Sequence, residues 1–288
     1  MTDLKRIQWL HVEATTRCNA HCPACVRNNN GYGIKKSLTI EDLSVDRLRE
    51  VIELLPNLKS IQLCGNRGDA VSAKNITNII DLILSYDKIE FIQLQTNGSL
   101  KTIEWWRDLA KKMKEVDHNV WFALDGLEDT HHIYRQGTDF KKIIDNASAF
   151  IENGGIATWQ FIPFEHNQHQ LKQCIALSRK LGFKDFKIVK SSRLPEVSRN
   201  YLTGEPYDIK PFYLNDKYNS LTLENSKKIV DIKECMHLEK PSLYLGANGM
   251  LSICCYLEGI NHLNTSIANG IINNKPAPIC LHFCGKKK

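Results

Sequence analysis

Residues 13–27 of the chain read EATTRCNAHCPACVR and carry three cysteines, Cys18, Cys22 and Cys25, in the spacing Cys-x3-Cys-x2-Cys. The stretch follows a short apolar run and precedes a loop rich in glycine and asparagine. Thiolates this close together repel one another and need a cation between them, usually a zinc ion or an iron–sulfur cluster. Zinc knuckles favour a Cys-x2-Cys pair with a fourth ligand nearby. Three unevenly spaced ligands suit three corners of a cubane with one open iron, so we predict such a cluster; a structural zinc loop is the alternative.

The composition is that of one large domain, or of one domain with a small appendage. The chain has 288 residues, 42% of them hydrophobic, and a mild net charge of +6, so nucleic-acid binding is not indicated. We find neither a signal peptide nor the ~18–20 consecutive apolar residues of a membrane span. The ten cysteines therefore fit metal ligation in a reducing cytoplasm better than a disulfide framework.

Strand-like and helix-like runs alternate from residue 7 to residue 189. The predicted strands are 7–13, 60–63, 91–95, 120–124, 158–162 and 186–189. The predicted helices are 40–55, capped by Thr39, and 75–84, 103–116, 140–152 and 168–181. This alternation implies a parallel sheet with helices outside it, and both a doubly wound sheet and a barrel satisfy it.

The alternation stops after residue 189. Residues 191–211 are irregular and polar, and a different module begins near Lys233. In that module the turn 246–249 separates two strand-like runs, 242–245 and 251–255, which predicts a β-hairpin. We therefore expect three parts: a core domain at 1–195, a linker or capping segment at 196–232, and a small C-terminal domain at 233–288.

The cysteine spacing after a first strand resembles the signature of the radical S-adenosylmethionine (SAM) superfamily. The resemblance implies that Cys18, Cys22 and Cys25 hold a [4Fe-4S] cluster whose open iron binds SAM, and that SAM is cleaved to a 5′-deoxyadenosyl radical. It also implies a partial (β/α)6 barrel of the TIM type, with the chemistry at the carboxyl ends of the strands. The family motif has an aromatic residue where this chain has Ala24, so the adenine contact would come from elsewhere, such as Val189 or the loop after Cys25.

Segments that follow successive strands also resemble those of the family. Residues 64–69, CGNRGD, resemble its Gly-Gly-Glu element, residues 96–99 a frequent Thr-Asn-Gly, and residues 123–127 a Ser-Leu-Asp-Gly segment. Residues 160–167 resemble a segment whose polar side chains reach SAM. Each alone is also an ordinary turn, but their order along the strands matches the family. The resemblance implies cofactor-binding roles for Gly65, Gly68, Asp69, Asn97, Asp125, Gln160, Asn167, Val189 and Ser191.

Two residues are candidates for a direct part in the reaction. Cys64 ends the second predicted strand beside the proposed SAM site, and our hypothesis is that it, or Cys255, donates a hydrogen atom or binds substrate. Asp125 is a candidate contact to SAM or to substrate. Cys174 falls within a predicted helix and is expected to be a small core residue.

A second set of cysteines lies near the C-terminus. The order Cys235, Gly249, Cys254 resembles the first half of the SPASM motif of radical SAM enzymes with auxiliary clusters. The full motif has seven cysteines, so the resemblance implies the shortened "twitch" variant with one auxiliary [4Fe-4S] cluster on Cys235, Cys254, Cys280 and Cys284. Cys255 is the alternative to Cys254, because adjacent strand residues face opposite sides. A four-cysteine zinc site is the other alternative.

Together these features favour a radical SAM enzyme that abstracts hydrogen from a small molecule or a short peptide. The auxiliary cluster would assist oxidation or substrate binding, and a reductant such as flavodoxin or ferredoxin would supply electrons. The sequence contains no recognisable leader-peptide-binding module, which favours a small molecule or an unguided peptide. A peptide maturase and a non-catalytic zinc-binding interaction protein are the alternatives.

Overall fold

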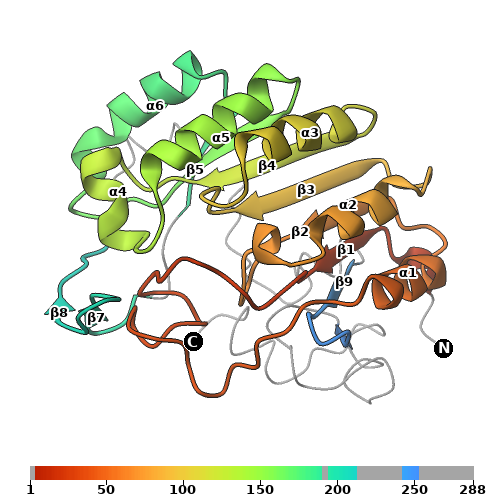
Figure 1. Cartoon of the computed structure of the whole chain (residues 1–288), viewed down its shortest axis with the longest axis horizontal. Coiled ribbons are helices and arrows are strands. Elements are labelled where there is room, and N and C mark those ends of the chain that lie inside the picture. The colour runs from red at the N-terminus through yellow and green to blue at the C-terminus, as the bar shows by residue number, and fades with distance from the viewer. Residues whose placement is uncertain (1–3, 190–193, 213–241, 253–288) are drawn as a thin grey trace, which may run out of the picture.

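A curved, mostly parallel sheet forms the centre of the molecule (Figure 1). The computed structural model describes residues 4–189, 194–212 and 242–252. The strand order is β10-β9-β1-β2-β3-β4-β5-β6, and only β10 runs antiparallel to its neighbour. The strands are β1 Trp9–Val12, β2 Ser60–Leu63, β3 Phe91–Thr96, β4 Asp117–Ala123, β5 Ala157–Phe161, β6 Asp185–Ile188, β9 Ser242–Leu245 and β10 Leu251–Ser252.

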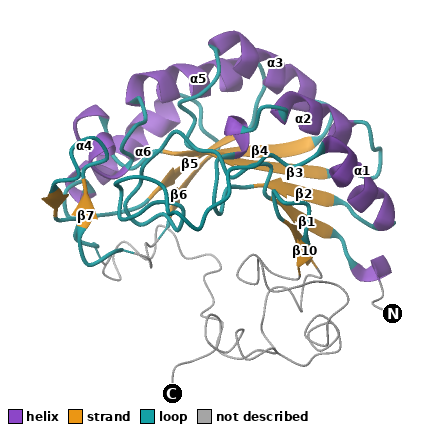
Figure 2. Ribbon diagram, turned by 60° about the horizontal axis from the view of Figure 1, so that its bottom comes forward, coloured by secondary structure: helices purple, strands orange, loops and turns teal. Residues whose placement is uncertain are grey.

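The α-helices form an outer layer on one face of this sheet (Figure 2). They are α1 Val45–Leu54, α2 Ile76–Leu84, α3 Ile103–Met113, α4 Glu128–Tyr134, α5 Phe140–Glu152 and α6 Leu171–Lys180. Short 3-10 turns occur at η1 Leu4–Arg6, η2 Ala70–Ser72 and η3 Gln168–Gln170. Six parallel strands with outer helices confirm the predicted α/β partial barrel. Within the described ranges, none of the helices combines the length and apolar character needed to cross a membrane.

The two faces of the sheet differ in character. On β2 and β3, buried side chains such as Ile61 and Leu94 alternate with half-buried ones such as Gln62 and Gln95. A parallel sheet covered on both faces reads as a continuous apolar run. The alternation therefore marks one face packed under the helices and an opposite face lined by polar side chains, where a ligand can be received.

The first helix begins later than the sequence predicts. Thr39 was expected to cap a helix from residue 40, but α1 begins at Val45 and its N-cap is Ser44, whose side chain accepts a hydrogen bond from the Arg47 N–H. The preceding residues are held by the chain after β1: Thr16 Oγ1 donates to the Thr39 carbonyl (2.7 Å) and Leu43 N to the Ala14 carbonyl (2.9 Å). These tertiary hydrogen bonds keep residues 39–43 out of the helix.

Helix α4 was not predicted from the sequence. Its seven residues, EDTHHIY, contain too few apolar positions to give a helical period. Its C-terminal end is fastened to a small ribbon of β7 Ser198–Arg199 and β8 Pro206–Tyr207, because the Tyr207 hydroxyl donates to the Ile133 carbonyl (2.8 Å). The ribbon lies in the segment predicted as a linker or cap, beside α4 in Figure 1.

The predicted hairpin is present in its described part, residues 242–252, and extends the central sheet. Strand β9 pairs in parallel with β1, with His11 opposite Tyr244, and β10 pairs back onto β9. The boundary expected at residue 233 lies outside the described residues, as do Ser191, Cys255 and the four predicted auxiliary-cluster ligands, Cys235, Cys254, Cys280 and Cys284. The three-part division and the twitch domain stay predictions.

Candidate functional site

A cavity of about 440 Å³ opens at the carboxyl ends of the strands, against the polar face of the sheet. Its volume falls in the range of small-molecule and cofactor sites. The residues that border it come from β1 to β5, from the loops that follow them, from α4 and from the end of β6. They include His11, Cys18, Cys22, Cys25, Gln62, Cys64, Gly65, Gly68, Asp69, Gln95, Asn97, Tyr134, Arg135, Gln160 and Val189.

The three clustered cysteines all border this cavity from the thiol loop, residues 18–25. Burial raises the pKa of the Cys22 thiol to about 11, and burial together with the nearby Asp69 carboxylate raises that of Cys18 further. Both thiols stay neutral until a bound cation stabilises their thiolates. No three His, Cys, Asp or Glu side chains in the described ranges converge on a single-ion site. The thiols border a wider space, which suits a polynuclear cluster better than a closed zinc knuckle.

Nitrogen donors already point at two of these sulfur atoms. Cys18 Sγ accepts hydrogen bonds from Ala20 N (3.3 Å) and Asn97 Nδ2 (3.7 Å), and Cys22 Sγ accepts one from Arg135 Nη1 (3.7 Å). Donors of this kind stabilise ligating thiolates and tune a cluster. The residues present therefore fit an iron–sulfur cluster at this loop.

Glu13 anchors the glycine loop, residues 65–69, that follows β2. Its side chain is fully buried and accepts hydrogen bonds from the backbone N–H groups of Asn66 (2.9 Å), Arg67 (2.8 Å) and Gly68 (2.8 Å). A fourth hydrogen bond comes from the Tyr244 hydroxyl (2.7 Å), on the hairpin. Sequence reasoning missed this role, although a carboxylate at the end of a buried strand was a visible signal.

The glycines of this loop are required by close backbone approach. A Cβ on Gly65 would lie 1.6 Å from the Gly68 carbonyl oxygen, and one on Gly68 would lie 2.0 Å from the Thr15 carbonyl oxygen. The next residue, Asp69, is buried and accepts from Asn97 N (2.6 Å) and Val71 N (3.0 Å). Burial raises the pKa of this carboxyl. Gly65, Gly68 and Asp69 all border the cavity, so the structure brings this predicted element beside the thiol loop.

Asp125 lies behind the cavity rather than on its border. Its carboxylate is fully buried, pairs with Arg135 Nε (2.5 Å) and accepts from Ile162 N (2.5 Å). Burial raises the pKa of this carboxyl, against the opposing effect of the Arg135 guanidinium. Arg135 does border the cavity. Sequence reasoning gave Arg135 no role.

The remaining predicted site residues divide into two groups. Asn97, Gln160 and Val189 border the cavity. Asn167 does not: it is buried, and its amide donates to the carbonyls of Asp125 (3.1 Å) and Ile162 (3.0 Å). The contacts of all these residues with SAM stay predictions.

Cys64 borders the cavity, and its proposed part in the reaction stays a prediction. Its Sγ shares a hydrogen bond with Nε2 of His11, on β1. The His11 ring in turn packs edge-on against Tyr244 of β9, with ring centroids 5.0 Å apart. Cys174 is fully buried in α6, as expected of a core residue.

Tyr134 supplies an aromatic side chain near the position where Ala24 departs from the family pattern. Both residues belong to the same buried apolar cluster, with Ile162 and Phe164, and both border the cavity beside the thiol loop. The centroids of the Tyr134 and Phe164 rings lie 4.5 Å apart. An aromatic side chain therefore borders the cavity, and it comes from α4 instead of from the thiol loop.

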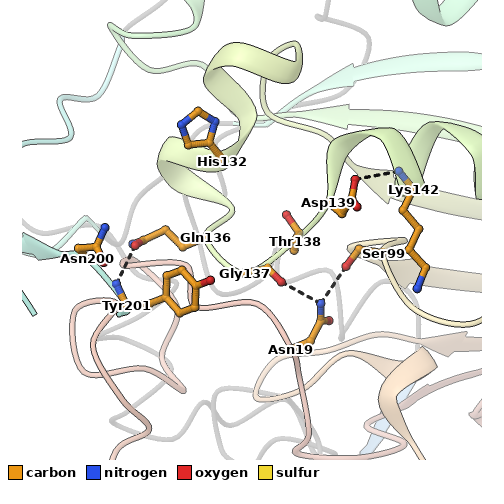
Figure 3. Close-up of a pocket in the computed structure, with 10 residues that line it drawn as sticks. All are labelled: Asn19, Ser99, His132, Gln136, Gly137, Thr138, Asp139, Lys142, Asn200 and Tyr201. Atoms are coloured by element: carbon orange, nitrogen blue, oxygen red, sulfur yellow. Dashed lines mark hydrogen bonds between the residues drawn. The ribbon is translucent and has the colours of Figure 1, made fainter. Parts of the chain in front are cut away.

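A second cavity, of about 570 Å³, lies beside the thiol loop (Figure 3). In this view Asn19 bridges two other segments: its Nδ2 donates to Ser99 Oγ (2.8 Å) and to the Gly137 carbonyl (3.2 Å). Asn97, which donates to Cys18, also donates to Asn19 Oδ1 (2.9 Å). The thiol loop is thus fixed by two segments distant in sequence, the loop after β3 and the residues after α4.

Known proteins resemble this chain in amino-acid sequence. A model described as "Radical SAM superfamily" matches residues 12–177, more than half of the chain. A GTP 3′,8-cyclase of Desulforamulus reducens is 29% identical over 126 residues, covering 43% of this chain and 36% of that protein. A GTP 3′,8-cyclase of Clostridium perfringens (strain SM101) is 25% identical over 294 residues, covering 93% of this chain and 86% of that protein. The chain spans 36% and 53% of the length of the first two curated relatives it matches.

Solved structures share the fold at low identity. SuiB of Streptococcus suis bound to S-adenosylmethionine superposes with a TM-score of 0.63 at 14% identity, covering 93% of this chain and 66% of that one. SuiB bound to its precursor peptide SuiA superposes with a TM-score of 0.62 at 13% identity, covering 92% and 64%.

Proposed function

This chain belongs to the radical SAM superfamily, and from that premise we propose that it binds a [4Fe-4S] cluster on Cys18, Cys22 and Cys25 and reductively cleaves SAM. When bound there, the cluster would supply the electron for that cleavage, and the 5′-deoxyadenosyl radical would abstract hydrogen from a substrate C–H bond. The observation that carries the proposal is the thiol loop itself, whose three cysteines border a cavity at the carboxyl ends of parallel strands. The protein's own part is to hold, orient and desolvate the reactants.

The border of the cavity supports the proposed binding of SAM. The glycine loop allows the backbone to approach a ligand closely, and the Asp69 carboxylate suits an ammonium group. Tyr134 and Val189 offer apolar surface for an adenine ring. In this proposal Asp125 acts from behind the cavity by holding Arg135, rather than by touching SAM.

Three glutamines point to the class of substrate. Gln62, Gln95 and Gln160 border the cavity from β2, β3 and β5, and their side-chain amides make no hydrogen bond with the described part of the chain. Amides recognise neutral groups that both donate and accept, as peptide bonds do. The guanidinium on the described border, that of Arg135, is already paired with Asp125. These features favour a short peptide or another neutral polar molecule.

A nucleotide substrate is the second candidate, because the relatives that match over most of this chain are GTP 3′,8-cyclases. A triphosphate requires several lysine or arginine side chains. The border of the cavity, in the described ranges, presents one guanidinium and no ammonium group. The preferred class, a peptide, is also supported by a similar fold in SuiB, whose structure was solved with its precursor peptide.

The proposal extends to the second cysteine set and to partners. Cys235, Cys254, Cys280 and Cys284 would hold an auxiliary [4Fe-4S] cluster that assists oxidation or substrate binding. A flavodoxin or ferredoxin in the cytoplasm would be the reductant. A non-catalytic protein with two zinc sites is the opposing hypothesis.

Anaerobic reconstitution followed by metal and sulfide analysis separates these hypotheses. About eight irons per chain supports two cubanes, and about four supports one. Dithionite and SAM are then added, and 5′-deoxyadenosine is measured alone, with GTP, and with a library of short peptides. Stimulation by peptides supports the preferred substrate class, and stimulation by GTP alone supports the second candidate.

A variant with Cys18, Cys22 and Cys25 all replaced by alanine is the control. It should lose about four irons and all 5′-deoxyadenosine formation. Undiminished 5′-deoxyadenosine from this variant, or stoichiometric zinc without iron in the wild type, would overturn the proposal.

A further inference from the structure

A buried ion pair lies directly against one of the three clustered cysteines. Arg135 Nη1 donates to Cys22 Sγ (3.7 Å), while Arg135 Nε pairs with Asp125 Oδ2 (2.5 Å). The Arg135 side chain is 15% exposed and the Asp125 side chain is not exposed at all. Interactions between charges are strong in such a poorly hydrated site, because little water screens them.

The guanidinium has little freedom to move away from Cys22. Its Cζ lies over the Tyr134 ring, 5.2 Å from the centroid. Its partner Asp125 is fixed in turn, because Oδ1 of that carboxylate accepts from Ile162 N (2.5 Å) at the end of β5. A short buried ion pair held from both ends keeps one geometry, which an exposed pair does not.

His131 locks the backbone on either side of this pair. Its Nδ1 accepts from Asp125 N (3.2 Å), and its Nε2 contacts Thr138 Oγ1 (2.9 Å). Since Thr138 Oγ1 donates its proton to the Arg135 carbonyl (2.6 Å), Nε2 of His131 must be the protonated nitrogen. The network joins the end of β4 to the end of α4. It therefore fixes the backbone of Arg135, from which the side chain extends toward Cys22.

We infer that Arg135 is a positioning residue that raises the reduction potential of the iron–sulfur cluster through its hydrogen bond and positive charge at Cys22. Reduction adds one negative charge to the cluster, and a fixed cation stabilises the reduced form more than the oxidised form. Asp125 opposes this effect, but it pairs with Nε of the guanidinium, whereas Cys22 accepts from Nη1. The inference rests on the proposed function, because it requires a cluster at the thiol loop.

The test is a potentiometric titration followed by electron paramagnetic resonance on the reconstituted full-length chain. The wild type is compared with Arg135→Gln, Arg135→Lys and Asp125→Asn, and the cluster at the thiol loop is identified by the signal that changes when SAM is added. Iron and sulfide are counted for every sample first. Arg179→Gln, in the last turn of α6, is the matched control for loss of an arginine elsewhere.

The two partners of the ion pair should shift the potential in opposite directions. Arg135→Gln is expected to lower the ratio of reduced to oxidised cluster at least tenfold at a fixed solution potential, equivalent to 59 mV for one electron. Asp125→Asn should raise this ratio, and Arg135→Lys and Arg179→Gln should stay close to the wild type.

Each outcome decides between the inference and its premise. An unchanged potential in Arg135→Gln with full cluster content overturns the inference and leaves the proposed function standing. If Arg135→Gln fails to hold a cluster, Asp125→Asn decides, and a potential at or below that of the wild type overturns the inference. A wild type without iron at the thiol loop refutes the proposed function itself.

Discussion

Replacing Glu13 with glutamine should loosen the glycine loop and destabilise the sheet at the carboxyl ends of its strands. Oε1 accepts from Arg67 N and Gly68 N, and Oε2 accepts from Asn66 N and the Tyr244 hydroxyl. A glutamine converts one of these oxygens into an NH2 donor. Backbone N–H groups cannot become acceptors, so at least one of them loses its partner whichever way the amide turns.

The cost follows from these bonds. The least unfavourable orientation directs the NH2 group at Tyr244, whose hydroxyl can turn to accept, and takes the Glu13 oxygen away from Asn66 N at about 1–3 kcal/mol. The two remaining backbone bonds lose their charged acceptor, which halves their strength and costs about 0.5–1 kcal/mol each. The sum is about 2–5 kcal/mol, or roughly 4–20 °C in Tm for a domain of this size.

Differential scanning calorimetry under anaerobic conditions measures this directly. Glu90→Gln is the matched control, since Glu90 is 61% exposed and pairs with Lys59 on the surface (2.7 Å), where an ion pair contributes about 0–1 kcal/mol. Tyr244→Phe removes one of the four donors to Glu13 in the described part of the chain and should give a smaller loss than Glu13→Gln. A Tm for Glu13→Gln equal to that of Glu90→Gln would refute the assignment of Glu13 as the anchor of the loop.

Three further predictions concern neighbouring parts of the site. Gly68→Ala places a Cβ 2.0 Å from the Thr15 carbonyl oxygen, so it should cost about 1–3 kcal/mol in chemical denaturation; wild-type stability would contradict the packing described. Burial lowers the pKa of His131 to about 3, so the unfolded chain takes up a proton first as the pH falls. That uptake removes about 1.4 kcal/mol of stability per pH unit between about pH 6.5 and 3. The fall in Tm between pH 7.0 and pH 5.5 should therefore be smaller in His131→Gln than in the wild type, and an equal fall would contradict this reading. Asn19→Leu removes the bonds to Ser99 and Gly137, so hydrogen exchange should speed up in the thiol loop while β3 stays protected; unchanged exchange would show that the bridge is dispensable.

The strands and the thiol loop were predictable because their signals are local. Residues 60–63 match β2 at both ends, and residues 140–152 match α5 at both ends. The period of apolar residues reports which backbone conformation buries one face, without reference to the rest of the chain. The closely spaced cysteines likewise demand a cation whatever surrounds them.

The roles of Glu13, Arg135 and helix α4 were not predictable in the same way. Helix α4 lacks a strong apolar period, and its position depends on contacts to Asp125 and Thr138. Arg135 received no role from the sequence, because its contacts with Asp125 and Cys22 exist only in the fold. Propensity and pattern carry no record of such partners, because each is set by packing between distant segments.

By itself, the sequence determined the parallel α/β core, the order of its strands along the chain and the loop of three cysteines for which we propose an iron–sulfur cluster. Only the tertiary structure decided which polar groups are engaged within the protein and which face the cavity. It engages Glu13 with Tyr244, 231 positions away, and it leaves the amides of Gln62, Gln95 and Gln160 at the cavity. The physical reason is that backbone conformation follows from neighbouring residues, whereas hydrogen-bond partners follow from which strand ends the folded sheet brings together.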